Sequence, residues 1–209
     1  ADSGKYSDTR GVLLQATSGN VRAFHSAEGS RPPTLEIVME NNGKLDTIRG
    51  ENLEDTYVAT GEGSAEQQRI MLRGGTARRG RLFFNVDAIP SPSIINHVAL
   101  YLHMDKAAST EYYRGYDSLV VYSSLDSAKN TLSSSGIITR LDSNDPSILI
   151  AEGGVLIQAV QNWVNKKGNN GLILVKYAEI SDLDRLVLYA ADAPADQRPR
   201  LVVTYTSQP

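Results

Sequence analysis

The residues best suited to bind a ligand lie in one short tyrosine-rich stretch. Tyr112, Tyr113, Arg114 and Tyr116 stand almost side by side in the sequence. A tyrosine ring can stack on the C–H face of a sugar, and an arginine can hold a uronate carboxylate with two hydrogen bonds. The stretch therefore predicts a sugar-binding site. The alternative is a loop whose tyrosines pack over the edge of the fold or against a neighbour.

A second group of residues carries oxygen ligands. Asp142, Asn144 and Asp145 follow one another closely in a loop-like segment. Several oxygens on one loop suit Ca²⁺, which takes six to eight of them. Asp and Asn are also common in turns without metal, because their side chains bond to their own backbone. Calcium is the one cofactor that the sequence suggests.

No arrangement of residues predicts catalysis. The histidines are His25, His97 and His103. His97 and His103 are expected on one strand, which would place them about 20 Å apart and prevent them from sharing a metal. No serine lies in a Gly-x-Ser-x-Gly turn, and no histidine stands in a recognisable triad frame. We therefore expect a protein that is not an enzyme.

Composition excludes further classes of partner. The 209 residues carry a net charge of -3, which argues against binding to nucleic acid phosphates. No apolar run approaches the roughly 20 residues of a membrane helix, so no membrane insertion is expected. The chain contains no cysteine and therefore no disulfide. A basic cluster at Arg69, Arg73, Arg78, Arg79 and Arg81 is expected to be a strand pair with solvated outward arginines, and the alternative is a surface that binds an acidic polymer.

Most of the chain reads as short strands separated by turns. In residues 81–87, apolar side chains at 82, 84 and 86 alternate with mostly polar ones, which is the period of a half-buried strand. Further strands are expected at 97–104, 119–122, 136–140, 148–150, 172–177, 186–190 and 201–205. Helical spacing instead predicts one amphipathic helix over 155–166, with Trp163 in the core. The expected fold class is all-β, a jelly-roll-like antiparallel β-sandwich with one short helix.

The two ends of the chain resemble each other. Both contain a glycine followed by an aliphatic strand, then a second strand ending in a small-small-acid turn, then a proline and a final strand. The matching segments are 11–14 with 171–174, 21–28 with 185–192, and 31–38 with 198–203. Residues 1–45 are therefore expected to be the closing strands of an incomplete repeat, and 46–209 a complete module.

The same residues resemble the DNRLRE family, the disaggregatase-related repeat of secreted bacterial and archaeal proteins. The resemblance rests on 55–58, 81–90, 95–104, 155–165, 169–174 and 198–205, and residues 7–40 resemble the closing section of the same family. It implies a jelly-roll-like sandwich, an extracellular or cell-surface location and a non-catalytic role. Some relatives bind acidic polysaccharides such as alginate, and others belong to surface-layer or matrix proteins.

Three strands cannot bury their apolar face alone, so the incomplete repeat needs a partner. It could be the tail of a preceding repeat, a set of strands given to a neighbouring subunit, or part of one enlarged sandwich. The residues expected to associate are Val12, Leu14, Phe24, Leu35 and Ile37. The first hypothesis is thus a structural or adhesive module that binds copies of itself or neighbouring repeats. The second is a carbohydrate-binding module for an anionic polysaccharide.

Overall fold

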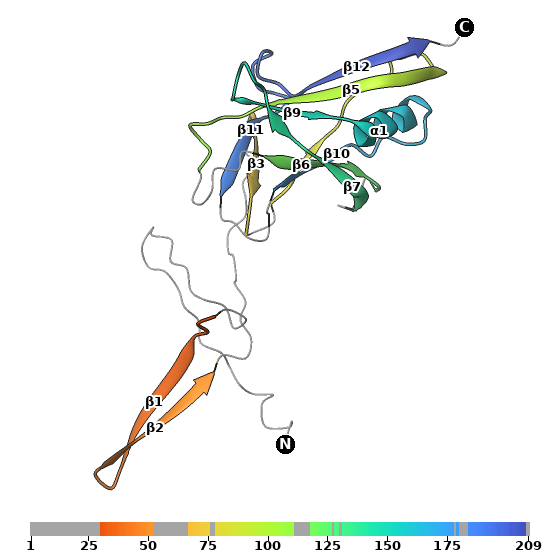
Figure 1. The fold of residues 1–209 in the computed structure, drawn as a ribbon. Helices are drawn as coiled ribbons and strands as arrows, with labels where there is room; N and C mark the ends of the chain where they lie inside the picture. Colours follow the sequence, from red (N-terminus) through yellow and green to blue (C-terminus); the bar gives the residue numbers. More distant parts are fainter. Residues whose placement is uncertain are drawn as a thin grey trace. The chain divides into compact units, whose positions relative to one another are not determined.

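The computed structural model describes residues 30–51, 67–75, 78–110, 118–126, 128–129, 131–177, 179 and 184–207. The chain divides into two compact units, Ala1–Thr60 and Gly61–Pro209. The described part of the first unit is a hairpin of two strands, and the second unit holds the other strands and the helix (Figure 1). We call these the hairpin and the sandwich.

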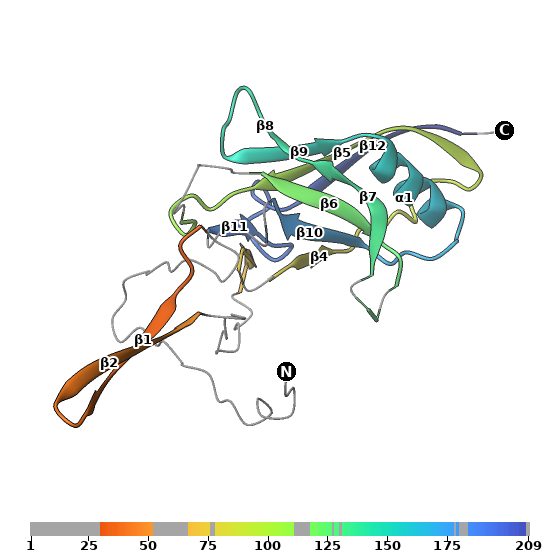
Figure 2. The same ribbon diagram turned by 60° about the horizontal axis from the view of Figure 1, so that its bottom comes forward.

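The sandwich contains two four-stranded antiparallel sheets. The first has the order β4 (Gly80–Leu82), β10 (Leu172–Lys176), β6 (Leu119–Ser124) and β7 (Leu132–Ile138). The second has the order β12 (Arg200–Ser207), β5 (Ser93–His103), β9 (Ile148–Glu152) and β8 (Arg140–Leu141). A two-stranded ladder joins β11 (Arg185–Tyr189) to β3 (Arg69–Arg73). The predicted fold class, an all-β antiparallel sandwich with one short helix, is confirmed (Figure 2).

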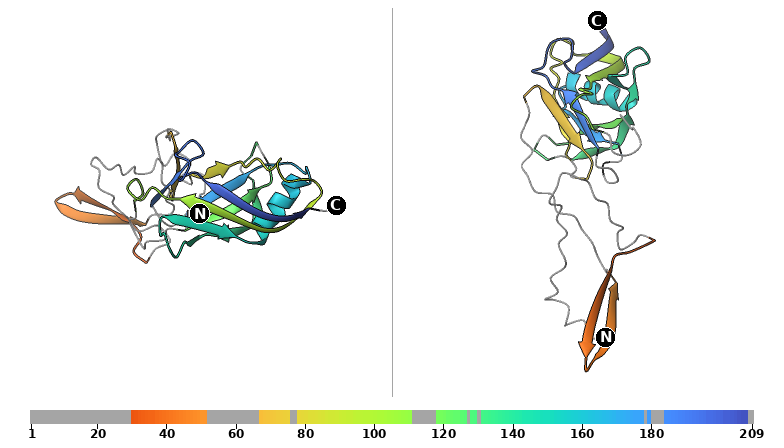
Figure 3. Two further views of the ribbon diagram at one scale, coloured as in Figure 1. Left: turned by 90° about the horizontal axis from the view of Figure 1, so that it is seen from above. Right: turned by 90° about the vertical axis from the view of Figure 1, so that its left-hand side faces the viewer.

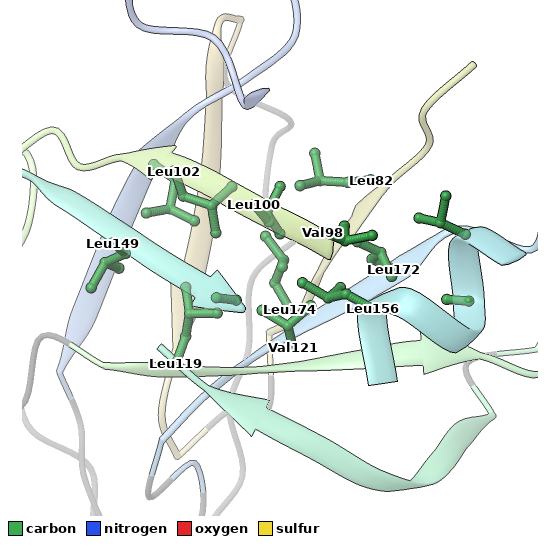
Figure 4. Close-up of a cluster of buried hydrophobic side chains, with 14 of the residues drawn as sticks. Leu82, Val98, Leu100, Leu102, Leu119, Val121, Leu149, Leu156, Leu172 and Leu174 are labelled. Carbon is green, nitrogen blue, oxygen red and sulfur yellow. The ribbon is translucent and has the colours of Figure 1, made fainter. Parts of the chain in front are cut away.

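The core lies between the two sheets because alternate side chains of each strand point inward. Leu100 of β5 and Leu149 of β9 meet Val121 of β6 and Leu174 of β10 in one buried cluster (Figure 4). All four are 0% exposed. The predicted strands on β5, β6, β9, β10, β11 and β12 are therefore confirmed, together with the faces that they bury.

The single helix closes one end of this core. Helix α1 runs from Gly154 to Val164 and buries Leu156, Ala159, Val160, Trp163 and Val164. Gln161 attaches it to β5, since its amide accepts a hydrogen bond from the Ile95 nitrogen at 3.0 Å and donates one to the Ser93 oxygen at 2.9 Å. The predicted helix and the core position of Trp163 are confirmed.

The strand expected over 136–140 is divided at Thr139. β7 ends at Ile138 in one sheet and β8 begins at Arg140 in the other, so the chain crosses between sheets at this residue. The buried Thr139 hydroxyl accepts a hydrogen bond from the Leu119 nitrogen at 3.0 Å. This bond satisfies a polar group at a corner where the ladder is interrupted.

The strand expected over 81–87 is much shorter than predicted. Only β4 is paired, although Leu82, Phe84 and Val86 still alternate inward against the core. The Asn85 side chain accepts a hydrogen bond from the Asp87 nitrogen at 2.7 Å, and the Ile89 nitrogen bonds to the Val86 oxygen at 2.9 Å. These local hydrogen bonds compete with the bonds of a β-ladder. The alternation of apolar and polar residues over 81–87 therefore indicates which side chains face the core, but not that the segment pairs with another strand.

The hairpin consists of β1 (Thr34–Asn41) and β2 (Lys44–Glu51), which pair over their full length (Figure 3). The two residues between them, Asn42 and Gly43, have φ angles of 52° and 74°. Two positive φ angles in an Asn-Gly loop make the tight turn whose twist matches antiparallel strands. The boundary expected between residues 45 and 46 therefore falls inside β2, and the structural division lies between Thr60 and Gly61.

Candidate functional site

One face of the hairpin carries four exposed apolar side chains, with Asp46 beside them opposite Met39. Alternation and register place Leu35, Ile37 and Met39 of β1 on the same face as Ile48 of β2, which stands opposite Ile37. Their exposed fractions are 56%, 46%, 41% and 51%. Contiguous apolar side chains exposed in this way are typical of an interaction surface. We call these four residues the apolar stripe.

The opposite face of the hairpin is mixed in character. Glu36 and Arg49 stand opposite each other and form an ion pair at 3.2 Å, with both side chains largely exposed. Val38 and Leu45 lie on this face too, and Leu45 is 75% exposed. Both faces therefore combine apolar and charged side chains, and the apolar stripe is the larger group of adjacent exposed apolar residues.

The counterpart of β1 in the sandwich is β12. Both strands have eight residues and follow a proline, Pro33 or Pro199. In β12, Leu201 and Val203 face inward and pack against the core. Their counterparts in the repeat are Leu35 and Ile37, which are exposed. The same pattern is thus covered in one unit and uncovered in the other.

Leu35 and Ile37 were predicted to take part in self-association, and the structure places both on the apolar stripe. The other three predicted residues, Val12, Leu14 and Phe24, lie outside the described residues. Met39 and Ile48 were not predicted as interaction residues, and the strand β2 was not predicted from the sequence. An Asn-Gly pair between two alternating runs is the signal that could have revealed the hairpin.

The loop predicted to bind calcium is organised by its own hydrogen bonds. Asp142 Oδ1 accepts from the Asn144 nitrogen at 2.7 Å, and Asp145 Oδ1 accepts from the nitrogen and hydroxyl of Ser147 at 2.8 and 2.6 Å. The Ser147 hydroxyl, followed by the Ser147 backbone, lowers the pKa of Asp145 below its usual range. Both carboxylates therefore act as turn acceptors here.

Among the described residues, no group of three or more His, Cys, Asp or Glu side chains could hold a metal ion. Asp142 and Asp145 with the Asn144 amide remain the oxygen-rich loop of the sandwich, and calcium binding there stays a prediction. The tyrosine stretch with Arg114 falls at positions 111–117, outside the described residues. Sugar binding by Tyr112, Tyr113 and Tyr116 therefore also stays a prediction.

Several arginines of the basic cluster bind the sandwich itself. Arg69 pairs with Asp105 at 2.7 Å, and Arg79 holds Glu179 through two hydrogen bonds of 2.9 and 2.7 Å. Arg81 donates to the Ser124 hydroxyl and to the carbonyl oxygens of Asp126 and Lys129 at 3.0–3.1 Å. Arg69 and Arg79 are nevertheless exposed, in agreement with the expectation of solvated outward arginines. Arg81 is half-buried and fastens a loop to the sheet, so the expectation is wrong for this residue.

A hollow of about 330 Å³ lies between the β6–β7 pair and helix α1, and most of its lining surface is apolar. Its polar side chains are Ser123, Ser133, Ser134, Ser135, Gln158 and Asn162. The Ser133 hydroxyl accepts from the Ser123 nitrogen at 3.1 Å and donates to the Ser135 oxygen at 2.8 Å. The hollow thus presents hydroxyl and amide groups and no charged side chain.

No known family, curated protein or solved structure matches the chain. In the part of the chain that the structure describes, no helix has both the length and the apolar character needed to cross a membrane. The resemblance to the DNRLRE family thus rests on the sequence motifs alone.

Proposed function

We propose that this protein is a non-catalytic structural or adhesive module of an extracellular surface or matrix assembly. It associates with copies of itself through the hairpin. The observation that carries the proposal is the apolar stripe, whose four side chains are 41–56% exposed. The extracellular setting is what the resemblance to secreted repeat proteins implies.

Physical chemistry supports a partner for the hairpin. An isolated two-stranded hairpin is marginal in water, because it has no third strand or helix against which to bury a face. Covering the remaining exposed half of each stripe residue would contribute on the order of 1 kcal/mol per side chain. A partner that covers the stripe therefore stabilises both the hairpin and the assembly.

Sedimentation velocity of the full chain over a wide concentration range tests the proposal. We expect wild type to form dimers or larger species and the Leu35→Asp/Ile37→Asp variant to remain monomeric. The matched control is Val38→Asp/Leu45→Asp, which places the same two charges on the opposite face at residues that are 58% and 75% exposed. A wild type that is monomeric at all concentrations, or equal effects of the two variants, would contradict the proposal.

A second candidate function is binding of a polysaccharide, and the hydroxyl and amide groups in the hollow beside helix α1 support it. Serine hydroxyls and the Gln158 and Asn162 amides can exchange hydrogen bonds with sugar hydroxyls. Anionic chains remain the expectation from the family resemblance and the tyrosine stretch, whereas this hollow is suited to uncharged sugar units. Affinity electrophoresis in alginate and in a neutral glucan, with wild type beside Ser134→Ala/Asn162→Ala and Tyr112→Ala/Tyr113→Ala, separates the two sites. No retardation of wild type in either gel would exclude this candidate.

A further inference from the structure

One edge of the hairpin presents a row of backbone hydrogen-bonding groups. Among the described residues, β1 pairs with β2 on one side only. The two-residue turn makes Asn41 and Lys44 a hydrogen-bonded pair, so every second residue of β1, counted back from Asn41, directs its backbone groups to β2. The stripe residues of β1 belong to this set. The residues between them direct their backbone groups to the free edge, and they are Thr34, Glu36, Val38 and Glu40.

This edge of β1 is poorly protected against the addition of another strand. β1 contains no proline, glycine or lysine, and its charged residues are Glu36 and Glu40. Glu36 is already paired with Arg49. The free edge of β2 is better protected, because β2 carries the charged residues Lys44, Asp46, Arg49 and Glu51. Strand addition is therefore expected at β1.

We propose that β1 pairs antiparallel with β1 of a second copy around a two-fold axis at Ile37, so that the two hairpins form one four-stranded sheet. This inference rests on the proposed function, because it names the surface through which the copies associate. The strand order is β2 and β1 of one copy, then β1 and β2 of the other. Three or more strands with an apolar face make a sheet stable in water, which a two-stranded hairpin is not.

The hydrogen-bonding pattern of the hairpin allows this register. In an antiparallel pair, facing residues either exchange both backbone hydrogen bonds or both direct their groups away, so residues that face the free edge must stand opposite each other. With the axis at Ile37, Glu36 faces Val38 of the second copy. Thr34 then faces Glu40 of the second copy, and all four residues direct their backbone groups to the free edge. Ile37 faces itself in a pair without hydrogen bonds, in which side chains approach most closely.

The same register joins the apolar stripes of the two hairpins. Ile37 meets Ile37 of the second copy, and Leu35 meets Met39 of the second copy on either side of the axis. Ile48 stands opposite Ile37 within each hairpin, so a row of four isoleucines runs across the four strands. Apolar side chains on facing residues stabilise a strand pair. Each stripe thereby covers part of the other.

Charge selects this register among those that the hydrogen bonds allow. An axis at Val38 sets Glu36 opposite Glu40 of the second copy, and an axis at Glu36 sets two Glu36 carboxylates opposite each other. Like charges on facing residues destabilise a strand pair. Axes farther along the strand in either direction shorten the pairing. In the proposed register residues 34–40 of both copies pair, and each carboxylate faces a neutral residue, Val38 or Thr34.

Single-cysteine chains test the pairing directly, because the wild type has no cysteine. At the axis, facing α-carbons are about 4.5 Å apart, a distance at which a disulfide can form. We expect Ile37→Cys to give about ten times as much covalent dimer as Val38→Cys in a glutathione buffer, because the two copies of Val38 stand diagonally, about 7–8 Å apart. Ile48→Cys is the matched control on the outer strand, since Ile48 shares the face of Ile37 and is 51% exposed against 46%.

Each outcome of this experiment has a distinct meaning. Equal dimer yields for Ile37→Cys and Ile48→Cys would indicate that the stripes pack face to face, which overturns the edge pairing and leaves self-association through the stripe intact. A Val38→Cys dimer as abundant as the Ile37→Cys dimer overturns the register. A wild type that is monomeric by sedimentation removes the proposed function and this inference together.

A charge substitution tests the register without a cross-link. We expect Val38→Lys to tighten self-association roughly threefold, because each new lysine faces Glu36 of the other copy. Thr47→Lys is the matched control, since Thr47 stands opposite Val38 on the outer strand, and it should change the dissociation constant by less than about twofold. Val38→Asp/Leu45→Asp should weaken self-association without abolishing it, because it adds a carboxylate opposite Glu36 and leaves the stripe in place. A Val38→Lys variant that associates more weakly than wild type would overturn the register.

Discussion

β1 and β12 are two strands of the same length and similar pattern with different surroundings. Each follows a proline and alternates apolar with polar side chains. β12 pairs with β5 and has a core behind it, whereas β1 pairs with β2 and every one of its residues is exposed. An alternating sequence pattern thus predicts a strand and the face that it can bury. Whether that face is buried depends on the strands and helices that pack against it.

The two units also differ in how they hold charge. In the sandwich, Lys176 and Asp184 are 3.7 Å apart and both side chains are 2% exposed. In the hairpin, Glu36 and Arg49 form their pair in water. A buried charge is stabilised only by its partners, but an exposed charge is stabilised by solvent as well. Removing a charged partner in the sandwich should therefore lower the free energy of unfolding more than the matched substitution in the hairpin.

The largest expected contrast comes from these ion pairs. Asp184→Asn removes the charge that faces the buried Lys176, and we expect it to lower the free energy of unfolding by about 3 kcal/mol. Glu36→Gln should change that free energy by less than about 0.5 kcal/mol, because its pair is exposed. Urea unfolding followed by tryptophan fluorescence measures the effect of Asp184→Asn, since Trp163 lies in the core of the sandwich. Amide hydrogen exchange of β1 and β2 measures the effect of Glu36→Gln in the hairpin. A smaller effect for Asp184→Asn than for Glu36→Gln would contradict the comparison.

The next contrast concerns two glycines with similar backbone angles. Gly171 has a φ of 78° and a β-carbon added to it would lie 2.6 Å from the Leu82 carbonyl oxygen, whereas Gly43 has a φ of 74° and open space around it. Gly171→Ala combines backbone strain with a clash and should cost about 2–3 kcal/mol. Gly43→Ala carries the strain alone and should cost about 1 kcal/mol.

Urea unfolding measures the cost of Gly171→Ala, and amide hydrogen exchange of the hairpin measures that of Gly43→Ala. We expect faster exchange in β1 and β2 for Gly43→Ala, with the sandwich amides unchanged. Gly50→Ala is the control within the hairpin, because its β-carbon would also meet open space and its φ lies outside the left-handed region. Equal exchange in both variants would show that the turn does not maintain the hairpin.

The sequence predicted the sandwich well because its signals are local and its core is formed within one chain. Alternation at Val98, Leu100 and Leu102 and helical spacing around Trp163 both reflect burial in the structure. The strand over 81–87 was wrong because the Asn85 side chain replaces ladder bonds, which alternation does not report. Local side-chain hydrogen bonds can thus shorten a strand while the apolar side chains of the segment still face the core.

The candidate site was only half predictable. Leu35 and Ile37 follow from the repeat, since each matches an inward residue of β12. Met39 and Ile48 join them only through the pairing of β1 with β2, which the repeat alone does not contain. The arginines of the basic cluster could not be assigned from sequence because their partners, such as Asp105 and Glu179, are distant along the chain.

A smaller contrast uses the matched leucines of the two strands. Leu201→Ala removes a half-buried side chain that packs on the core, and we expect a loss of about 1.5 kcal/mol in the unfolding free energy. Leu35→Ala should cost less than about 0.5 kcal/mol in dilute monomer, because the side chain is already exposed. Urea unfolding measures the effect of Leu201→Ala in the sandwich. Amide hydrogen exchange of β1 and β2, at low and at high protein concentration, measures the effect of Leu35→Ala in the hairpin. If self-association covers Leu35, the cost of Leu35→Ala should then rise, and a cost independent of concentration would argue against that cover.

The smallest expected effect concerns the loop of Asp142 and Asp145, which is held by side-chain hydrogen bonds, whereas the hairpin has an Asn-Gly turn. Hydrogen bonds from Ser147 lower the pKa of Asp145, so the carboxylate stabilises the folded loop at neutral pH. A pKa lowered on folding contributes stability at pH values above the ordinary pKa of the carboxyl, and this contribution is lost as the pH falls below about 4.

Ser147→Ala should raise the pKa of Asp145 toward its ordinary value, although the Ser147 nitrogen still donates a hydrogen bond to this carboxylate. An NMR titration of the Asp145 carboxyl carbon measures the shift, with the exposed Ser143→Ala as the control from the same loop. An unchanged Asp145 pKa in Ser147→Ala would mean that the bond from the Ser147 nitrogen is enough to hold this carboxyl below its usual range and that the hydroxyl bond does not hold the turn.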